Sequence, residues 1–390
     1  MARQDRLDLI NRIETLCGCD VIVYFCGDHP LAQAMIADDA TRHLYDHILS
    51  LSDSDPKRPI ALFVYSRGGA LEAPWKIVTM IRSYRDAFHV IVPYRAYSAT
   101  TLLAMGADKI LMTRKGELGP IDPSLHLGGH GAEKPLKLVL NELGVEDVAG
   151  YIRFLRDRVG LTDQEPLSRL MQILAQELTP ALLGNIERIY SHIRLVANKL
   201  LSLHRPPFDQ EHITRAIEAL TEKTYLHGHG IGRNEAREIG LDIQNADGEL
   251  EHVCWDLYVQ YESALGLLQC GDPNAYFSNA DDDMATCPST ATACIESKNL
   301  LHAFGGNLEL RRRRKYPPQL TINVNLGLQV PPIPNVQQIP PMVQQAVNQI
   351  LQNGIVDIQQ QVHKEIARQA PVEAIDIRLA SGQWRRVDDL

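Results

Sequence analysis

The sequence contains no run of 18 or more uninterrupted apolar residues, and its first residues contain no apolar stretch of the kind found in signal peptides. The first observation argues against a membrane-spanning helix. The second gives no indication of secretion. We therefore expect a soluble, cytoplasmic protein without a membrane span.

Cysteine is sparse and shows no pairing pattern. The seven cysteines are scattered along the chain, and although Cys17 and Cys19 form a Cys-x-Cys pair, no second pair stands at zinc-finger spacing. Free thiols in a reducing compartment explain this pattern better than disulfides or a metal centre. We expect no metal site and no other cofactor.

Positive charge is in deficit, with 39 Lys and Arg against 48 Asp and Glu. The net charge of −9 gives no reason to expect nucleic acid as a partner. The one basic run, Arg311 to Lys315, is expected to be a solvated loop. With 45% hydrophobic and 22% charged residues, the 390-residue chain has an ordinary globular composition, and its length suggests two or three domains.

Short apolar runs alternate with helical patterns over residues 1–125. The runs at residues 21–25, 60–65, 88–93 and 109–112 predict buried strands, and most of the stretches between them have helical spacing. Continuously apolar strands that alternate with helices are typical of a parallel sheet covered on both faces. The sequence therefore predicts an α/β core at residues 1–125.

The rest of the chain is expected to form three further parts. Residues 126–250 have mainly helical patterns and predict a helical extension that completes the domain. Residues 251–330 predict an irregular or β connecting region, with a loop at 279–292. Residues 331–390 combine a Pro-rich linker, a Gln-rich helix interrupted by Gly354 and a terminal strand, and we expect a separate module for oligomerisation or partner binding.

Two loops that follow strands carry residues suited to acyl-transfer chemistry. Gly68 and Gly69 follow one predicted strand, and paired glycines let backbone N–H groups approach a ligand, as in an oxyanion hole. Ser98 follows the next strand, at the first turn of a predicted helix, where free N–H groups favour negative charge. A structural N-cap for Ser98 and a simple tight turn for the glycines are the alternatives.

A wider set of motifs resembles the serine dehydrogenase proteinase family. The resembling segments, in chain order, are VIVYFCGD, LFVYSRGG, VPYRAYSATTLLAMGADKILM, ELGPIDP, VEDV and HGHGIGRNEAREIGL. This family is related to Clp protease and signal peptide peptidase A within the Clp/crotonase superfamily. The resemblance covers roughly the first 245 residues.

The resemblance implies a fold and a set of roles. It implies a Clp/crotonase-like spiral of βαβ units, with Ser98 as the nucleophile. It also implies that Gly68 and the N–H of Ala99 bind the oxyanion, while Gly69 assists the turn. The chain departs from the family pattern at two positions: Arg67 stands where Pro is usual, and Thr100 stands where Gly is usual.

The base that would activate Ser98 is left open among several residues. Where Clp proteases have a histidine this chain has the Asp122 neighbourhood, and His126 lies just beyond it. Signal peptide peptidase relatives use a lysine instead, and Lys134 and Lys137 lie near that spacing, Lys137 being the preferred candidate. A lysine serves as a base when burial lowers its pKa. His130 is a further candidate, and the absence of a competent base is the remaining alternative.

Three functions remain in view. The first is a serine peptidase that acts on polypeptide through an acyl-enzyme at Ser98. The second is a catalytically degenerate scaffold for assembly or partner binding, which the Arg67 and Thr100 departures favour. The third is a crotonase-like enzyme acting on a thioester, which the presence of Ser98 disfavours. The superfamily resemblance and the Gln-rich helix also predict a homo-oligomer.

Overall fold

The computed structural model describes residues 3–29, 31–51, 55–121, 124–126, 142–221, 228–268, 271–279, 282–315 and 340–390. Its contacts group the chain into two compact units. The first combines Met1–Cys270, Thr290–Gly306 and Gly382–Leu390, and the second combines Gly271–Ser289 and Asn307–Ser381. The division expected from sequence at residues 125, 250 and 330 stays a prediction.

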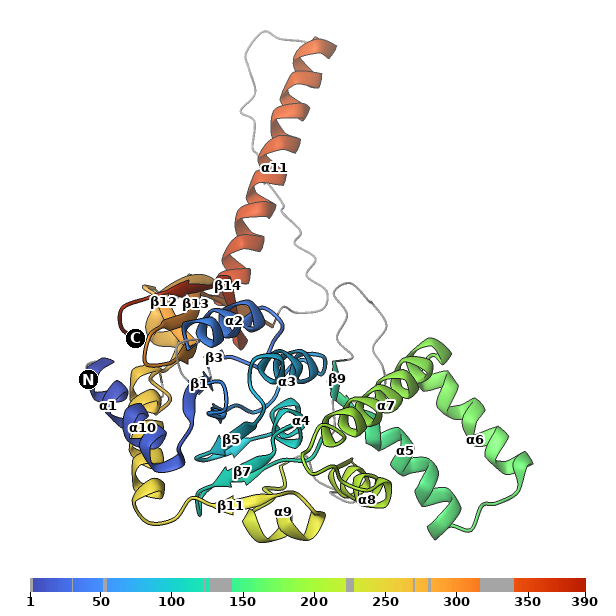
Figure 1. Cartoon of the computed structure of the whole chain (residues 1–390). Helices are drawn as coiled ribbons and strands as arrows, with labels where there is room; N and C mark the ends of the chain where they lie inside the picture. Colours follow the sequence, from blue (N-terminus) through green and yellow to red (C-terminus); the bar gives the residue numbers. More distant parts are fainter. Residues whose placement is uncertain are drawn as a thin grey trace. The chain divides into compact units, whose positions relative to one another are not determined.

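The first unit contains an eight-stranded sheet (Figure 1). Three of its strands, β12, β13 and β14, also have residues in the second unit. Its strand order is β11-β7-β5-β4-β1-β12-β13-β14. The bounds are β1 Asp20–Cys26, β4 Ile60–Tyr65, β5 Phe88–Val92, β7 Lys109–Met112, β11 Ile243–Asn245, β12 Met284–Glu296, β13 Leu301–Arg314 and β14 Val372–Arg386. Neighbours from β11 to β1 pair in parallel, which confirms the strands expected in the α/β core.

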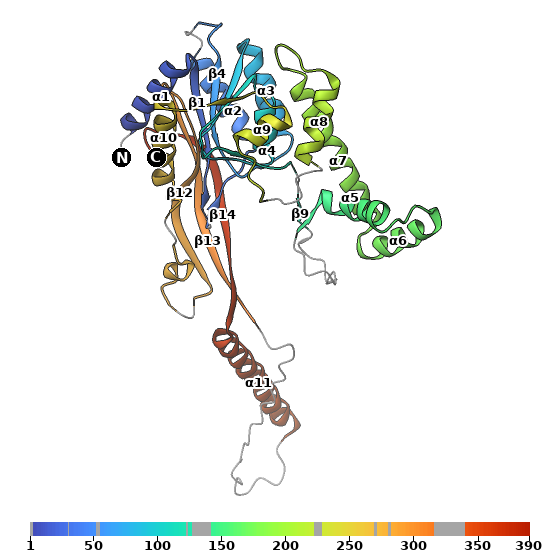
Figure 2. The same ribbon diagram turned by 90° about the horizontal axis from the view of Figure 1, so that it is seen from below.

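The two faces of the sheet bury different sets of side chains. Along β1, Ile22, Tyr24 and Cys26 enter one apolar cluster, which includes residues of α2 (Ala40–Ser50), α3 (Ala73–Tyr84) and α4 (Ala99–Met105). The intervening side chains of β1 enter a second cluster with α1 (Arg3–Cys17) and α10 (Glu249–Ala264). This alternation is the period of a strand buried on both faces, and Figure 2 shows α1 and α10 side by side.

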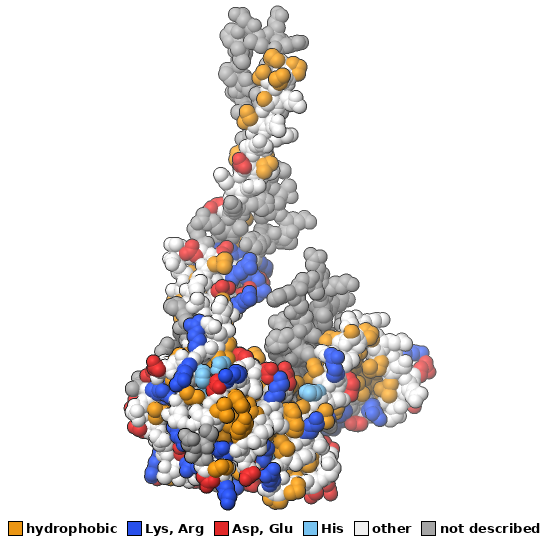
Figure 3. Space-filling model, turned by 45° about the horizontal axis from the view of Figure 1, so that its top comes forward, with side chains coloured by type: hydrophobic (Ala, Val, Ile, Leu, Met, Phe, Trp, Pro, Cys, Tyr) orange, Lys and Arg blue, Asp and Glu red, His pale blue; other side chains and the backbone are white. Residues whose placement is uncertain are grey.

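The described residues between 142 and 240 form mainly helices. They contain α5 Val145–Arg153, a π-helical turn Phe154–Arg158, α6 Gln164–Glu177, α7 Pro180–Leu201, α8 Gln210–Thr221 and α9 Arg233–Ile239. The end of α7 joins the main core through Val196 and Leu200. Val148 and Ile186, in contrast, belong to a small separate cluster. Several large apolar side chains here stay exposed, among them Phe154 and Ile173, and Figure 3 shows hydrophobic side chains gathered over this part of the molecule.

Several expectations for the later part of the chain are wrong. The sheet is mixed rather than parallel throughout, because β12 pairs antiparallel with β1. The loop expected at 279–292 is largely strand β12, and the helix α11 (Pro341–Gln369) runs through Gly354 without interruption.

The expected strand near the C-terminus is present as β14 at the end of the strand order. Among the described residues, no helix is long and apolar enough to cross a membrane.

The basic run at the end of β13 is also not a solvated loop. Arg314 is buried, and its Nε donates to Asp283 Oδ1 at 2.6 Å while its Nη1 donates to the carbonyl of Ala370. Arg312 lies over the ring of Phe277 at 3.9 Å from the centroid. These arginines connect strands and loops within the second unit. A run of like charges in the sequence does not reveal such contacts.

A buried ion pair joins α1, β12 and α10 in the first unit. Arg6 Nε donates to Glu296 Oε2 at 2.7 Å, and both side chains are almost fully buried. The hydroxyl of Tyr261 donates to the same carboxylate oxygen at 2.7 Å. A buried charge that loses its partner is strongly destabilising, because the remaining charge stays desolvated.

We predict that Glu296→Gln lowers the free energy of unfolding by about 3 kcal/mol, because Arg6 would keep its charge in a buried site with only the half-exposed Asp389 as its counter-ion. Glu249→Gln is the matched control, since Glu249 pairs with Arg12 at the surface and such pairs contribute about 1 kcal/mol or less. Urea unfolding of both variants measures the difference. Equal losses in the two variants would contradict this account of the buried pair.

Candidate active site

Two loops at the carboxyl ends of the neighbouring strands β4 and β5 meet at the candidate site. The backbone N–H of Ser66, just after β4, donates to the carbonyl of Arg95 at 3.0 Å. The N–H of Tyr97, in the loop after β5, donates back to the carbonyl of Ser66 at 3.0 Å. These two bonds hold the loops together at the edge of the sheet where open α/β folds bind ligands.

Gly68 lies directly against Ser98. A Cβ added to Gly68 would stand 2.9 Å from the Cβ of Ser98 and 3.4 Å from its Oγ. The φ angle of Gly68 is 125°, which also disfavours a side chain at this position. The residue is buried, whereas Ser98 is only half-buried. The sequence motif therefore has glycine where the backbone must approach the serine closely.

Ser98 itself has an unusual backbone conformation. It precedes the first residue of α4 with φ 52° and ψ −114°, and its side chain makes no capping hydrogen bond. A non-glycine residue with positive φ costs about 1–3 kcal/mol and persists only where its surroundings enforce it. The hydroxyl of Ser98 therefore does not cap the helix, which was the alternative role considered for this residue. Strand–turn–helix nucleophiles in hydrolases sit on sharp, strained turns of this kind.

The turn at Ser98 is fixed by hydrogen bonds on its helical side. Thr101 Oγ1 lies 2.8 Å from the carbonyl of Ala96 and 2.8 Å from that of Gly119, and it accepts from the N–H of Gly119 at 3.1 Å. The hydroxyl of Tyr97 donates to Glu117 Oε2 at 2.6 Å. Burial and this carboxylate raise the pKa of Tyr97 to about 12. Tyr97 therefore stays a protonated hydrogen-bond donor at neutral pH.

Of the two N–H groups expected to form the oxyanion hole, that of Gly68 has a hydrogen-bond acceptor in the structure and that of Ala99 has none among the described residues. The N–H of Gly68 donates to Ser66 Oγ at 3.1 Å, and the Ser66 hydroxyl donates to the carbonyl of Gly68 at 3.0 Å. The Ser66 side chain thus holds the peptide group of Gly68 in its present orientation.

Gly69 is fixed by the segment before α2. The N–H of Ile36 donates to the carbonyl of Gly68 at 2.8 Å, and the N–H of Ala70 donates to the carbonyl of Ile36 at 2.8 Å. A Cβ at Gly69 would stand 2.0 Å from the carbonyl oxygen of Ile36. This close backbone crossing explains the second glycine of the motif, because no side chain fits there.

The two departures from the family pattern have distinct surroundings. Arg67 is half exposed, and its Nε donates to Asp28 Oδ2 at 2.5 Å. Asp28 also accepts a bond from the Tyr65 hydroxyl at 2.9 Å, so the charge of Arg67 is matched by a fixed carboxylate. Thr100 is fully buried, and within the described part of the chain its Oγ1 has no hydrogen-bond partner.

The candidate bases fall outside what the structure describes. Lys134, Lys137, His130 and Asp122 lie outside the described residues. His126 lies in β9 (Ser124–His126), which pairs with β10 (Glu142–Gly144), and its side chain is not among those described. The identity of the base stays a prediction.

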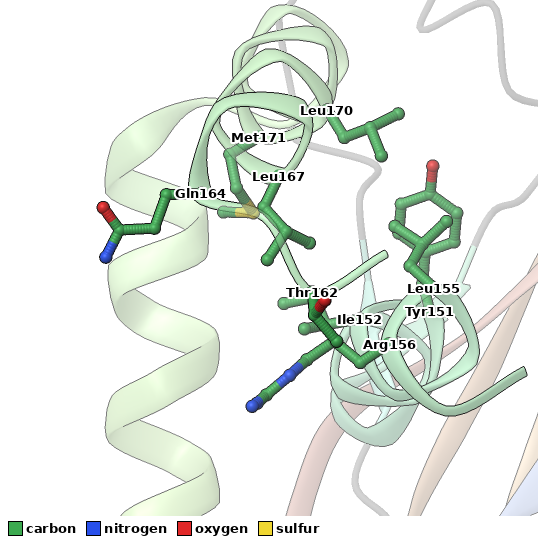
Figure 4. Close-up of a pocket in the computed structure, with 9 residues that line it drawn as sticks. All are labelled: Tyr151, Ile152, Leu155, Arg156, Thr162, Gln164, Leu167, Leu170 and Met171. Carbon is green, nitrogen blue, oxygen red and sulfur yellow. The ribbon is translucent and has the colours of Figure 1, made fainter. Parts of the chain in front are cut away.

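A pocket of about 380 Å³ opens in the helical extension (Figure 4). Its lining comes from α5, the π-helical turn, α6 and the segment before α6, and it is mostly apolar, with Leu155, Leu167 and Met171 among its residues. None of the residues that line it is a predicted site residue.

Sequence reasoning missed Ser66 and Thr101, whose hydroxyls hold the backbone of the site. Ser66 stands directly before the Arg-Gly-Gly segment, and Thr101 stands three residues after Ser98. Their positions beside the motif were visible, but a hydroxyl near a turn has many acceptors within reach. Only the fold shows that these hydroxyls bond Gly68 and Gly119.

Comparisons with known proteins find a family match in the first part of the chain. The model of a family described as ClpP-like SDH-type serine proteinase matches residues 9–150. An uncharacterized protein of Methanocaldococcus jannaschii is 26% identical over 216 residues, which are 55% of this chain and 64% of that protein. A second uncharacterized protein of the same organism is 33% identical over 67 residues, or 17% of this chain and 23% of that protein. The chain thus spans less than two thirds of the length of either relative.

Among solved structures, ClpP1 from Listeria monocytogenes matches over 61% of this chain and 98% of its own length. The TM-score is 0.32 and the sequence identity is 15%. Agreement at this level is too low to assign a fold on its own.

The strain at Ser98 leads to a prediction that is independent of activity. Ser98→Gly should be more stable than Ser98→Ala by about 1 kcal/mol, because glycine adopts positive φ without penalty. At Ser202, where φ is −71°, the order should reverse, and Ser202→Ala should be the more stable variant. Chemical denaturation of the four variants measures both orders. The same order at the two sites would contradict a strained Ser98.

Proposed function

We propose that this chain, whose residues 9–150 match the model of the ClpP-like SDH-type serine proteinase family, is a serine peptidase that forms an acyl-enzyme at Ser98. Its substrate class would be polypeptide, and its βαβ units would follow the Clp/crotonase-like spiral. The observation that carries the proposal is the strained backbone of Ser98 beside Gly68, which points to a residue held for chemistry rather than for helix capping.

The proposed reaction has two steps. A base removes the proton from Ser98 Oγ as the oxygen bonds to the carbonyl carbon of a peptide, and the carbonyl oxygen becomes an oxyanion. The base then gives its proton to the leaving amine, which departs and leaves an acyl group on Ser98. Water, deprotonated by the same base, attacks this ester and releases the second product with regeneration of the hydroxyl.

The oxyanion would be held by backbone N–H groups at the meeting of the two loops. Ala99 provides a donor that is without an acceptor among the described residues. Gly68 would provide the second donor after exchanging its bond to Ser66 Oγ for one to the oxyanion. Removal of one such donor costs about 2.7–4 kcal/mol of transition-state stabilisation, so this exchange would have a large effect on rate.

Lys137 is the preferred base within this proposal, with Lys134 and His126 as alternatives. A lysine must be neutral to accept the proton of Ser98, so its pKa must be lowered by burial near the site. It must also come within about 3.2 Å of Ser98 Oγ in the competent state.

A non-catalytic scaffold is the second candidate, and one observation favours it. The N–H of Gly68 is already bonded to Ser66, so only the donor of Ala99 is open in this conformation. If Gly68 never exchanged its partner, the site would lack half of its proposed oxyanion hole, and the fold would serve assembly or partner binding.

We expect a fluorophosphonate probe to label the wild-type chain and to leave Ser98→Ala unlabelled, because the hydroxyl of Ser98 is the attacking group. Ser83→Ala is the control, since the Ser83 hydroxyl is an exposed one that bonds the carbonyl of Thr79, and it should label as the wild type does. Absence of labelling in the wild type would favour the scaffold.

The same probe identifies the base. Lys137→Ala and Lys137→Arg should both abolish labelling, because nucleophile and base act as a unit and a guanidinium keeps its proton at working pH. Lys134→Ala should label normally. Full labelling of Lys137→Ala would remove this lysine from the mechanism and transfer the role to Lys134, His126 or His130.

The proposed assembly is a homo-oligomer, since α11 exposes apolar side chains such as Met342 and Ile350 that need a covering surface. Light scattering at micromolar concentration should give a mass that is a multiple of the 43.6 kDa chain. A particle of 43.6 kDa would contradict the proposed oligomer.

A further inference from the structure

Three histidines and an aspartate meet where α2 faces the turn between β12 and β13. His43, Asp46 and His47 are spaced so that they share one side of α2. His302 lies at the start of β13 and is buried. All four residues belong to the first unit, and none of them has a role in the chemistry assigned to Ser98.

Three of these residues are close enough together to share one ion. His43, Asp46 and His302 each offer a ligand atom, and these atoms lie within 4.8 Å of one another. Ligands about 2.1 Å from a single zinc ion can be at most about 4.2 Å apart. Small side-chain rotations would therefore bring the set into coordinating range.

One ring nitrogen in the cluster is buried without a partner. His43 Nδ1 has no hydrogen bond among the described residues. The ring of His43 is covered by Trp384, with centroids 5.5 Å apart, and it lies 4.7 Å from the ring of His302. A buried polar atom without a partner is uncommon and needs an explanation, and a bound cation would supply one.

His47 orients the ring of His302 through a hydrogen bond. His302 Nδ1 lies 3.1 Å from His47 Nε2, and His47 Nδ1 lies 2.7 Å from Ser297 Oγ. If His302 donates to His47, and His47 donates to Ser297, the other ring nitrogen of His302 is unprotonated and free to bind a cation. Histidine ligands in metal sites are oriented by hydrogen bonds of this kind.

Besides Asp46, the charged groups that act on the three histidines are Arg3, Asp39, Arg42 and Arg386. Asp46 forms an ion pair with Arg42 one turn earlier in α2, and the Arg42 side chain is 68% exposed. Arg42 can therefore turn to solvent when a cation approaches the carboxylate.

We propose that His43, Asp46 and His302 bind one divalent transition-metal ion of the Zn²⁺ class. Two imidazoles and one carboxylate are a ligand set that zinc accepts, with a water in the fourth position. The ion would connect α2 to β13 and so fasten the sheet to the helix that covers it. The expectation of no metal site rested on patterns that are local in the sequence, which say nothing about histidines from distant parts of the chain.

The test is isothermal titration of the chelator-treated full chain with Zn²⁺, in a Cys17→Ser background that removes the Cys-x-Cys pair as a competing site. We expect one Zn²⁺ per chain and a melting temperature that rises with Zn²⁺ concentration. Co²⁺ should give a visible absorption band without the near-ultraviolet charge-transfer band of a thiolate ligand.

Matched variants decide whether these residues are the ligands. His43→Ala, His302→Ala and the milder Asp46→Asn should each abolish the Zn²⁺-dependent rise in melting temperature, and His47→Gln should weaken binding about 10–100-fold as an orienting residue. His252→Ala, an exposed histidine on α10, should bind as the parent does. Absence of Zn²⁺ binding in the parent, or binding that survives in the folded Asp46→Asn and His43→Ala variants, would overturn the proposal.

Discussion

The close approach of Gly68 to Ser98 is the contact on which the candidate site depends. It requires a glycine after β4, and it puts the serine of the next loop beside the backbone of the first. The paired bonds between Ser66 and the Arg95–Tyr97 segment hold the loops at this distance. Thr101 and Gly119 then fix the start of α4, so the strained φ of Ser98 is enforced from both sides.

The surroundings of Arg67 show how a bulky cation fits beside such a site. Its guanidinium is turned to Asp28, which also accepts from Tyr65 and lies 3.6 Å from Arg95. The carboxylate thus holds positive charge in a fixed place near the loops. Asp28 therefore balances part of the positive charge of Arg67 and Arg95.

Much of the core could be predicted from sequence because its signals are local. The strands β1, β4, β5 and β7 are short, continuous apolar runs, and they lie within a residue of their expected ends. The meeting of the Gly68 and Ser98 loops also follows from local patterns, because neighbouring parallel strands present their carboxyl ends at one edge.

The features that sequence reasoning missed depend on contacts between distant residues. Residues 279–292 include three adjacent aspartates and many small residues and so resemble a loop, yet from Met284 onward they form part of β12. Arg314 looks like one member of a solvated run, but Asp283 and Ala370 surround it. His302 lies more than 250 residues from His43, so no local pattern could have joined them. Ser66 was visible, but its bond to the Gly68 N–H requires the geometry of the loop.

A crystal structure of the chain after reaction with a fluorophosphonate tests the central claim most directly. The account predicts a phosphonyl group on Ser98 Oγ, with one of its oxygens accepting hydrogen bonds from the N–H groups of Ala99 and Gly68, and with the bond from Gly68 to Ser66 broken. A phosphonyl oxygen that faces solvent while Gly68 stays bonded to Ser66, or an adduct on a residue other than Ser98, would contradict it.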